Sequence, residues 1–284
     1  MECSHAPGFF SVFGTVGIGA DSLVLIEESR IADAKMRFFN LDGSEGKMAG
    51  NAIRCVGKFL YDNNIRGIQE KHGRRTDNTE NITIETEAGV KKLVLYKQNG
   101  KVTSVTVDMG APSFVPEELP TKLKVSPVLP SEINKGKEDK LPSEAVINAP
   151  LNISGTEYKV TCLAVGNPHC VVFSKFVDKE PVAKIGPKFE CNKVFPQKTN
   201  TEFVRVAGPN ELKMRTWERG NGETLACGTG ACAAVVASVL NGYSPLDTDI
   251  TVKVRGGNLT VRYTGDTVLL TGGTNLCFEG EVEI

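Results

Sequence analysis

The sequence lacks the features that would place the protein in a membrane or on nucleic acid. No stretch of its 284 residues approaches the run of about 20 apolar residues that a membrane-spanning helix needs. Residues 1–13 lack the basic start and apolar core of a signal peptide. With a formal net charge of -1, the chain has no general electrostatic attraction to nucleic acid or to an anionic membrane surface. We therefore expect a cytoplasmic protein with neither kind of partner.

The cysteines also lack the spacing of a small metal or redox centre. None of the eight belongs to a Cys-x-x-Cys pair, which excludes the usual zinc-ribbon and thioredoxin patterns. In a cytosolic chain of this size, reduced thiols that pack as small apolar groups are expected. One cysteine, Cys227, has a setting that points to chemistry instead. The eight are Cys3, Cys55, Cys162, Cys170, Cys191, Cys227, Cys232 and Cys277.

The hydrophobic pattern predicts many short strands and two helices. Apolar residues at helical spacing predict a helix over residues 51–62, and an Ala- and Val-rich segment predicts a wholly buried helix over 229–240. The segment 126–143, with three prolines, is expected to decorate the surface. Strands are predicted at 22–27, 34–40, 81–87, 91–96, 102–108, 158–165, 170–173, 202–206 and 211–217, with more from residue 250 onward.

The segments that lead into the two predicted helices are alike. Aligning Ala49 with Cys227 sets an offset of 178 (227 − 49), which also superposes Glu45 on Glu223 and Gly50 on Gly228. We interpret Glu45 and Glu223 as supports of the helix start rather than as acids. The repeat predicts an α+β fold with two pseudo-symmetric β-rich domains, each wrapped around a central helix, and an active site in the interdomain cleft. The expected domains are 1–116, completed by a C-terminal strand at 273–284, and 117–272.

A thiol at a helix start is suited to proton transfer. The unsatisfied N–H groups there bind anions, and their partial positive charge lowers the pKa of a thiol. Cys227 directly precedes a predicted helix, whereas Cys55 and Cys232 fall inside helices and are interpreted as packing residues. Two such helix starts on either side of one substrate would suit inversion of a carbon centre. One thiolate would remove a proton from one face while a thiol delivers a proton to the other.

Several motifs, in order along the chain, resemble the signatures of the diaminopimelate epimerase family. The resemblance begins at GIGAD (17–21) and runs to the C-terminus. Its specific segments are FNLDGSE (39–45), GNAIRC (50–55), GNPHC (166–170), TNTEFV (199–204), WERG (217–220) and ACGTG (226–230). One of these motifs alone would be weak, but together and at this spacing they are highly specific.

The resemblance implies an isomerase that interconverts LL- and meso-2,6-diaminopimelate in lysine biosynthesis. It implies a small amino-acid substrate, no pyridoxal phosphate, no metal or other cofactor, and a homodimer. Cys227 would be an acid/base thiol, with His169 and Glu218 assisting proton transfer. The implied substrate-binding residues are Asn40, Gly50, Asn51, Asn167, Asn200, Arg219, Gly228 and Thr229.

The chain departs from the family at two places. Ala49 stands where the family has its other catalytic cysteine, and a methyl group cannot exchange a proton. Residues 1–16 do not match the family's N-terminal strand, so the substrate asparagine of that strand is expected to be missing. An engineered inactivating change, a degenerate or repurposed paralogue, and a truncated gene model with an independent change at Ala49 would each account for this.

Three functions therefore remain open. The first and leading one is diaminopimelate epimerisation, although nearly all inversion should be lost because no obvious group replaces the thiol at Ala49. The second is racemisation of another amino acid on the same fold, although Asn40, Asn167, Asn200 and Arg219 match a site for a second amino-acid head group. The third is amino-acid binding without catalysis.

Overall fold

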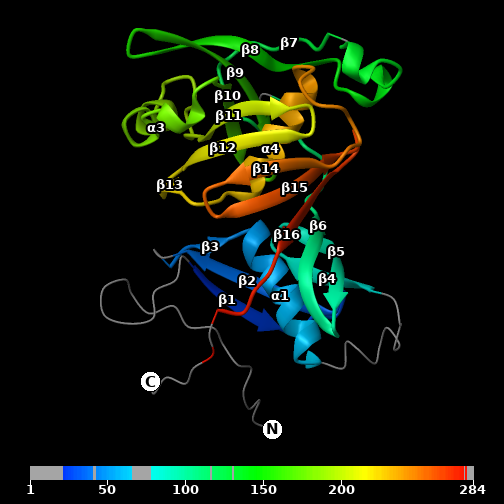
Figure 1. The fold of residues 1–284 in the computed structure, drawn as a ribbon. Coiled ribbons are helices and arrows are strands. Elements are labelled where there is room, and N and C mark those ends of the chain that lie inside the picture. Colours follow the sequence, from blue (N-terminus) through cyan, green and yellow to red (C-terminus); the bar gives the residue numbers. More distant parts are fainter. Residues whose placement is uncertain are drawn as a thin grey trace. The chain divides into compact units, whose positions relative to one another are not determined.

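The chain forms two compact units, each rich in β-strands (Figure 1). The computed structural model describes residues 22–40, 43–65, 78–115, 117–129, 131–277 and 279. The first unit comprises residues 1–107 and 271–284, and the second comprises residues 108–270. No described helix is both long enough and apolar enough to cross a membrane.

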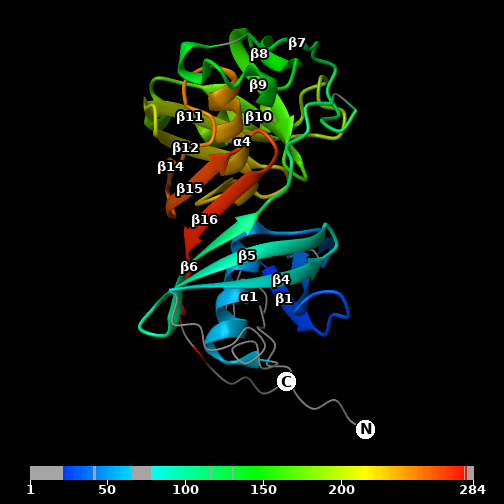
Figure 2. The same ribbon diagram turned by 90° about the vertical axis from the view of Figure 1, so that its right-hand side faces the viewer.

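In the first unit, one helix packs against a mixed sheet. The strands are β1 (Ser22–Glu27), β2 (Ala34–Asn40), β3 (Glu45–Gly46), β4 (Thr79–Thr86), β5 (Gly89–Gln98) and β6 (Lys101–Asp108), and the helix is α1 (Gly50–Asp62). The sheet order is β1-β2-β4-β5-β6, with β3 paired to β2. Gly57 of α1 lies so close to β5 that an added Cβ would be 3.0 Å from Leu93 and from Leu95. Figure 2 shows this helix along the sheet.

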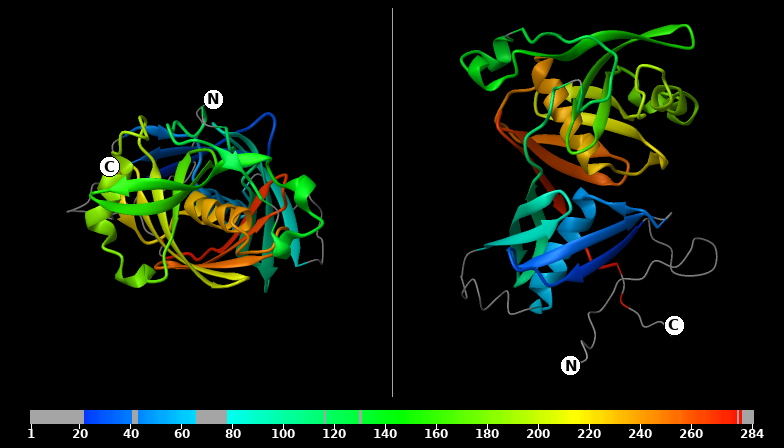
Figure 3. Two further views of the ribbon diagram at one scale, coloured as in Figure 1. Left: turned by 90° about the horizontal axis from the view of Figure 1, so that it is seen from above. Right: turned by 180° about the vertical axis from the view of Figure 1, so that it is seen from behind.

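The second unit encloses its central helix more completely. Helix α4 (Gly228–Leu240) is buried at every position except Thr229, as its apolar sequence predicts, and it packs against several surrounding strands (Figure 3). The sheet order is β15-β14-β12-β11-β10-β9-β8-β7, with β13 paired to β12. The remaining elements are β7 (Ser126–Pro127), β8 (Glu144–Ile153), β9 (Thr156–Ala164), β10 (Pro168–Phe173), α3 (Val182–Glu190), β11 (Asn200–Gly208), β12 (Glu211–Glu218), β13 (Gly222–Thr224), β14 (Ile250–Val254), β15 (Gly257–Tyr263) and β16 (Val268–Gly273).

The internal repeat extends from the helices to strand register. Adding 178 to the bounds of α1 (50 + 178 and 62 + 178) gives those of α4, 228 and 240. Leu23 of β1 pairs with Phe39 of β2, and at the same offset Thr201 of β11 pairs with Trp217 of β12. Both pairs of strands are antiparallel. The predicted fold of two similar β-rich halves, each with a central helix, is therefore confirmed.

The glutamates before the two helices, Glu45 and Glu223, are held in the same way in both halves. Arg37 Nε donates to Glu45 Oε1 at 2.7 Å, and Arg215 Nε donates to Glu223 Oε1 at 2.8 Å. The first pair joins β2 to β3, and the second joins β12 to β13, so in each half an ion pair links a long strand to the short strand before the helix. Both glutamates are thus held by arginine, in agreement with their interpretation as supports.

Two segments differ from what the sequence predicts. Helix α3 (Val182–Glu190) was missed because it contains Gly186 and Pro187, two residues that disfavour helix interiors. Packing explains the glycine, since a Cβ on Gly186 would overlap the ring of Trp217. The segment 126–143 is largely exposed, yet its residue Asn134 is buried and accepts a hydrogen bond from Leu246 N at 2.6 Å. This surface segment is therefore anchored to the core by one amide.

Candidate active site

Cys227 is the N-cap of α4, as the sequence predicts. Its Sγ accepts a hydrogen bond from Gly230 N–H at 3.3 Å and lies 3.5 Å from Thr229 Oγ1. The backbone of Cys227 is extended, with φ −124° and ψ 116°, and the first bond within the helix runs from Ala231 N to Cys227 O. The N–H groups of Gly228 and Thr229 precede that bond, so they have no acceptor within the helix.

The thiol of Cys227 does not have the lowered pKa that is expected at a helix start. Burial raises the pKa of Cys227 well above its usual range, and the nearby carboxylates of Glu218 and Glu202 raise it further. The hydrogen bonds from Gly230 and Thr229 lower the pKa, but by less. Two negative charges and the loss of solvation thus outweigh the favourable end of the helix. In this arrangement Cys227 is a neutral thiol near pH 7, which makes it a proton donor until a base ionises it.

His169 is buried at the start of β10, between two acceptors. Its Nδ1 lies 2.8 Å from Glu202 Oε1, and its Nε2 lies 2.9 Å from Asn167 Oδ1. Only 1% of the histidine surface is exposed, and none of that of Glu202. Both ring nitrogens of His169 therefore have a partner within the second unit.

Glu202 is the residue of this region that sequence analysis missed. It was quoted in the TNTEFV motif but was given no role. Its Oε1 also accepts a hydrogen bond from Thr216 Oγ1 at 3.4 Å, whereas its buried Oε2 has no hydrogen-bond partner among the residues that the structure describes. A Cβ on Gly230 would lie 2.7 Å from Glu202 Oε1 and 3.2 Å from Cys227 Sγ, so the carboxylate and the thiol flank the same glycine. One signal in the sequence could have indicated a role for Glu202: it is a carboxylate within a predicted apolar strand, and buried charges are seldom found without a partner.

Glu218 ends β12, and Arg219 begins the turn that follows it. Glu218 is half-buried, and its Oε1 accepts a short hydrogen bond from Thr224 Oγ1 on β13. The guanidinium of Arg219 is exposed and donates from Nη1 to Gln197 O at 3.0 Å. Asn200 is buried and connects this turn to β10, because its Nδ2 donates to Pro168 O at 2.9 Å and its Oδ1 accepts from Arg219 N at 2.9 Å.

The predicted site residues of the first unit lie at the end of β2 and at the start of α1. Asn40 ends β2 and donates from Nδ2 to Ser44 Oγ at 3.0 Å. Ala49 is the N-cap of α1, with φ −133° and ψ 120° and no side-chain cap. Gly50 and Asn51 follow it, and Arg54 donates from Nη1 to Gly50 O at 2.9 Å and from Nη2 to Asn51 Oδ1 at 3.0 Å. The mismatch expected at residues 1–16 falls outside the described residues.

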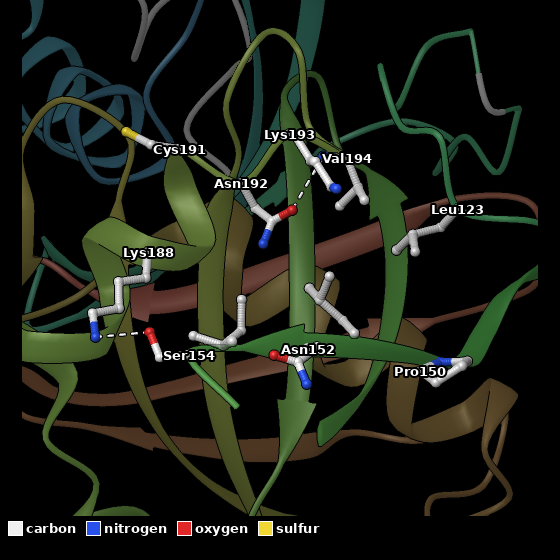
Figure 4. A pocket seen from close by; sticks show the side chains of 11 residues that line it. Leu123, Pro150, Asn152, Ser154, Lys188, Cys191, Asn192, Lys193 and Val194 are labelled. Atoms are coloured by element: carbon white, nitrogen blue, oxygen red, sulfur yellow. Dashed lines mark hydrogen bonds between the residues drawn. The ribbon is translucent and has the colours of Figure 1, made fainter. Parts of the chain in front are cut away.

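An open hollow of about 540 Å³ lies elsewhere on the second unit (Figure 4). Its lining includes Lys188 and Ser154, which are hydrogen-bonded at 2.9 Å, and it contains none of the predicted site residues. Across the described ranges, no group of three or more His, Cys, Asp or Glu side chains is arranged to hold a metal ion.

The fold is similar to that of two solved structures. It matches the structure of a probable proline racemase from Agrobacterium radiobacter K84 with a TM-score of 0.63 at 15% identity, over 95% of this chain and 78% of that one. It also matches a hydroxyproline epimerase from Agrobacterium vitis with a TM-score of 0.61 at 16% identity, over 91% and 74% of the two chains. At these identities, the likeness concerns the fold alone.

Sequence similarity identifies the family. The family model for diaminopimelate epimerase matches residues 14–115 and 161–276. Proteins named diaminopimelate epimerase are 47% identical in Methanococcus maripaludis and 48% identical in Acetivibrio thermocellus, over 94% of this chain and 86% and 85% of theirs. The chain belongs to the diaminopimelate epimerase family, whose members are isomerases.

Proposed function

We propose that the protein acts on 2,6-diaminopimelate, with Cys227 as the group that exchanges a proton with the α-carbon. The observation that carries this proposal is the setting of Cys227, a buried thiol at a helix start with two carboxylates close by. Relatives at 42–48% identity bear the name of this activity. Their names support the choice of diaminopimelate over other amino acids.

In this proposal Glu218 is the base that ionises Cys227. The Glu218 carboxylate is close enough to raise the pKa of the thiol, so it is placed to accept the thiol proton when a substrate enters. The thiolate then removes the α-proton from one face of the substrate. In the reverse sense, the neutral thiol returns a proton to the α-carbon. The N–H groups of Gly228 and Thr229 would bind the α-carboxylate at the same helix start.

The distal amino-acid head of the substrate would be held by the polar side chains at the ends of β2, β10 and β12. Arg219 presents an exposed guanidinium, whose planar fork matches a carboxylate. Asn167 is half-exposed and presents an amide, and Asn40 does the same from the first unit. Asn200 is already bonded to two backbone groups, so part of its contribution would be to fix the positions of Pro168 and Arg219.

Ala49 limits what Cys227 can do alone. Inversion needs a second group that transfers a proton, and position 49, which corresponds to Cys227 in the repeat, has only a methyl group. The protein would therefore exchange the α-proton through Cys227 much faster than it inverts the carbon. The same observation favours a second candidate function, amino-acid binding without turnover.

The test is incubation of the full chain with LL-diaminopimelate in D₂O, followed by NMR and chiral chromatography. Exchange with retention of configuration is the expected result. Exchange with meso product would mean that another group replaces the thiol at position 49. Binding without exchange would support the second candidate, and absence of binding would refute both.

A further inference from the structure

Hydrogen bonds at both ring nitrogens hold His169 between Glu202 and the side-chain amide of Asn167. Asn167 Oδ1 can only accept a hydrogen bond, so a proton on Nε2 of His169 must lie between them. On the other side of the ring, a single proton on the line from Nδ1 to Glu202 Oε1 completes the second bond, whichever of the two atoms carries it. Both ring nitrogens of His169 and Glu202 Oε1 thus have hydrogen-bond partners, as polar groups buried this completely require.

The hydrogen bond from the ring also fixes the orientation of the Asn167 amide. Because its Oδ1 is bonded to the ring, its amide orientation is fixed and its two Nδ2 hydrogens point away from the histidine. Asn167 is half-buried, whereas the two residues behind it are buried. The amide therefore ends a chain of hydrogen bonds that starts at Thr216 and runs through Glu202 and His169. Two N–H donors at the open end of such a chain suit a carboxylate.

We infer that Glu202 is a positioning residue that orients Asn167, through His169, as a donor for a carboxylate of the substrate. This inference rests on the proposed function for the identity of that substrate. Glu202 contacts no substrate in this scheme, and its role is to hold the ring of His169 with Nε2 toward Asn167. Without the carboxylate, Nδ1 loses its hydrogen-bond partner, and the ring is no longer held in the position that presents Nε2 to the Asn167 oxygen.

The first test needs no variant. The chain has three histidines, so a long-range ¹H–¹⁵N spectrum of the ¹⁵N-labelled protein contains three ring systems, and His169→Gln identifies the one that matters. Nε2 of His169 is expected to carry a proton, because Asn167 Oδ1 can only accept a hydrogen bond. An unprotonated Nε2 in the folded protein would overturn the inference. Because this measurement uses no substrate, it stands even if the proposed function fails.

The second test separates positioning from packing. Glu202→Met keeps the volume of the side chain but removes its hydrogen bond to Nδ1, whereas Glu202→Gln keeps a partner for Nδ1. The dissociation constant for LL-diaminopimelate is expected to rise about tenfold in Glu202→Met and to stay within about threefold of the parent in Glu202→Gln. Equal constants for the two variants would overturn the inference.

A double-mutant cycle tests the route through Asn167. Glu202→Met combined with Asn167→Ala is expected to bind no more weakly than the worse single variant, since both changes remove the same interaction. Arg219→Ala serves as the control partner, and its effect is expected to multiply with that of Glu202→Met. If the effect of Glu202→Met on the dissociation constant multiplies with that of Asn167→Ala as it does with that of Arg219→Ala, the inference is overturned. If Glu202→Met does not fold, two measurements still test the inference. They are the protonation of His169 Nε2 in the parent and the dissociation constant of Glu202→Gln. Failure of the parent to bind would refute the proposed substrate instead.

Discussion

Replacing Ala49 by cysteine should restore inversion. The backbone at position 49 already has the conformation of Cys227: φ and ψ are −133° and 120° at Ala49, and −124° and 116° at Cys227. Both residues precede a helix of 13 residues that starts with glycine. A thiol at position 49 would therefore stand at a helix start that needs no rearrangement to receive it, with the N–H of Ala52 in the place of that of Gly230.

The size of the gain follows from the chemistry of proton transfer. A positioned acid or base contributes about 10² to 10⁴ in rate, so Ala49→Cys should raise the rate of inversion by this factor, about 3 to 5 kcal/mol of transition-state stabilisation. The matched control is Ala49→Ser. Serine is a good N-cap and should stabilise α1 by about 1 kcal/mol relative to alanine, but its hydroxyl does not exchange protons at neutral pH as a thiol does.

The assay follows LL-diaminopimelate and meso-diaminopimelate by chiral chromatography, with thermal unfolding measured on the same samples. Ala49→Cys should produce the meso product, and Ala49→Ser should gain stability without gaining activity. The reasoning is refuted if Ala49→Cys binds the substrate yet inverts it within about threefold of the rate of the parent. It is refuted equally if the serine variant matches the cysteine variant.

Three further predictions concern the second unit. Cys227→Ala should abolish α-proton exchange in D₂O while substrate binding persists; exchange that survives the change would remove the thiol from its role. Gly186→Ala should destabilise the protein by about 1 to 3 kcal/mol, because a Cβ there overlaps Trp217, and denaturant titration against Ala183→Gly on the exposed face of α3 would measure it. Burial, with a smaller contribution from Asp266, raises the pKa of Tyr263 from 10.0 to about 12. The folded state favours the protonated phenol of Tyr263, so the phenol stabilises the fold fully below about pH 10. As the pH rises from there to about 12, the free energy of unfolding falls by up to about 1.4 kcal/mol per pH unit. Unfolding measured from pH 9 to pH 12 in the parent and in Tyr263→Phe should show a smaller loss in the variant.

Local chemistry made much of the fold predictable. Strands β1 and β2 have the bounds predicted from their apolar pattern, and α1 and α4 each begin one residue before the predicted start. Both helices follow a glycine-containing turn and end at an asparagine, signals that lie within a few residues of the boundary they set. By contrast, α3 contains Gly186 for a reason that no local pattern records, the close approach of Trp217 from β12.

The electrostatics of the site could not be predicted in the same way. The position of Cys227 at a helix start is local and was found, but its pKa depends on burial and on Glu202 and Glu218, which precede it by 25 and 9 residues (227 − 202 and 227 − 218). Sheet register brings Glu202 to His169, since β10 and β11 are parallel and His169 pairs with Asn200. The direction of a pKa shift in a β-rich site thus requires the strand order, which a single sequence does not provide.

The repeat shows how chemistry is divided between two similar halves. At the offset of 178, Glu218, Cys227 and Glu202 of the second unit correspond to Asn40, Ala49 and Val24 of the first. The strands and the helix are retained in both, while all three groups that can gain or lose a proton occur in the second. A thiol introduced at position 49 would therefore lack the two carboxylates that raise the pKa of Cys227. It should ionise at a lower pH than Cys227, so in an Ala49→Cys variant the new thiol would be the readier base and Cys227 the readier acid.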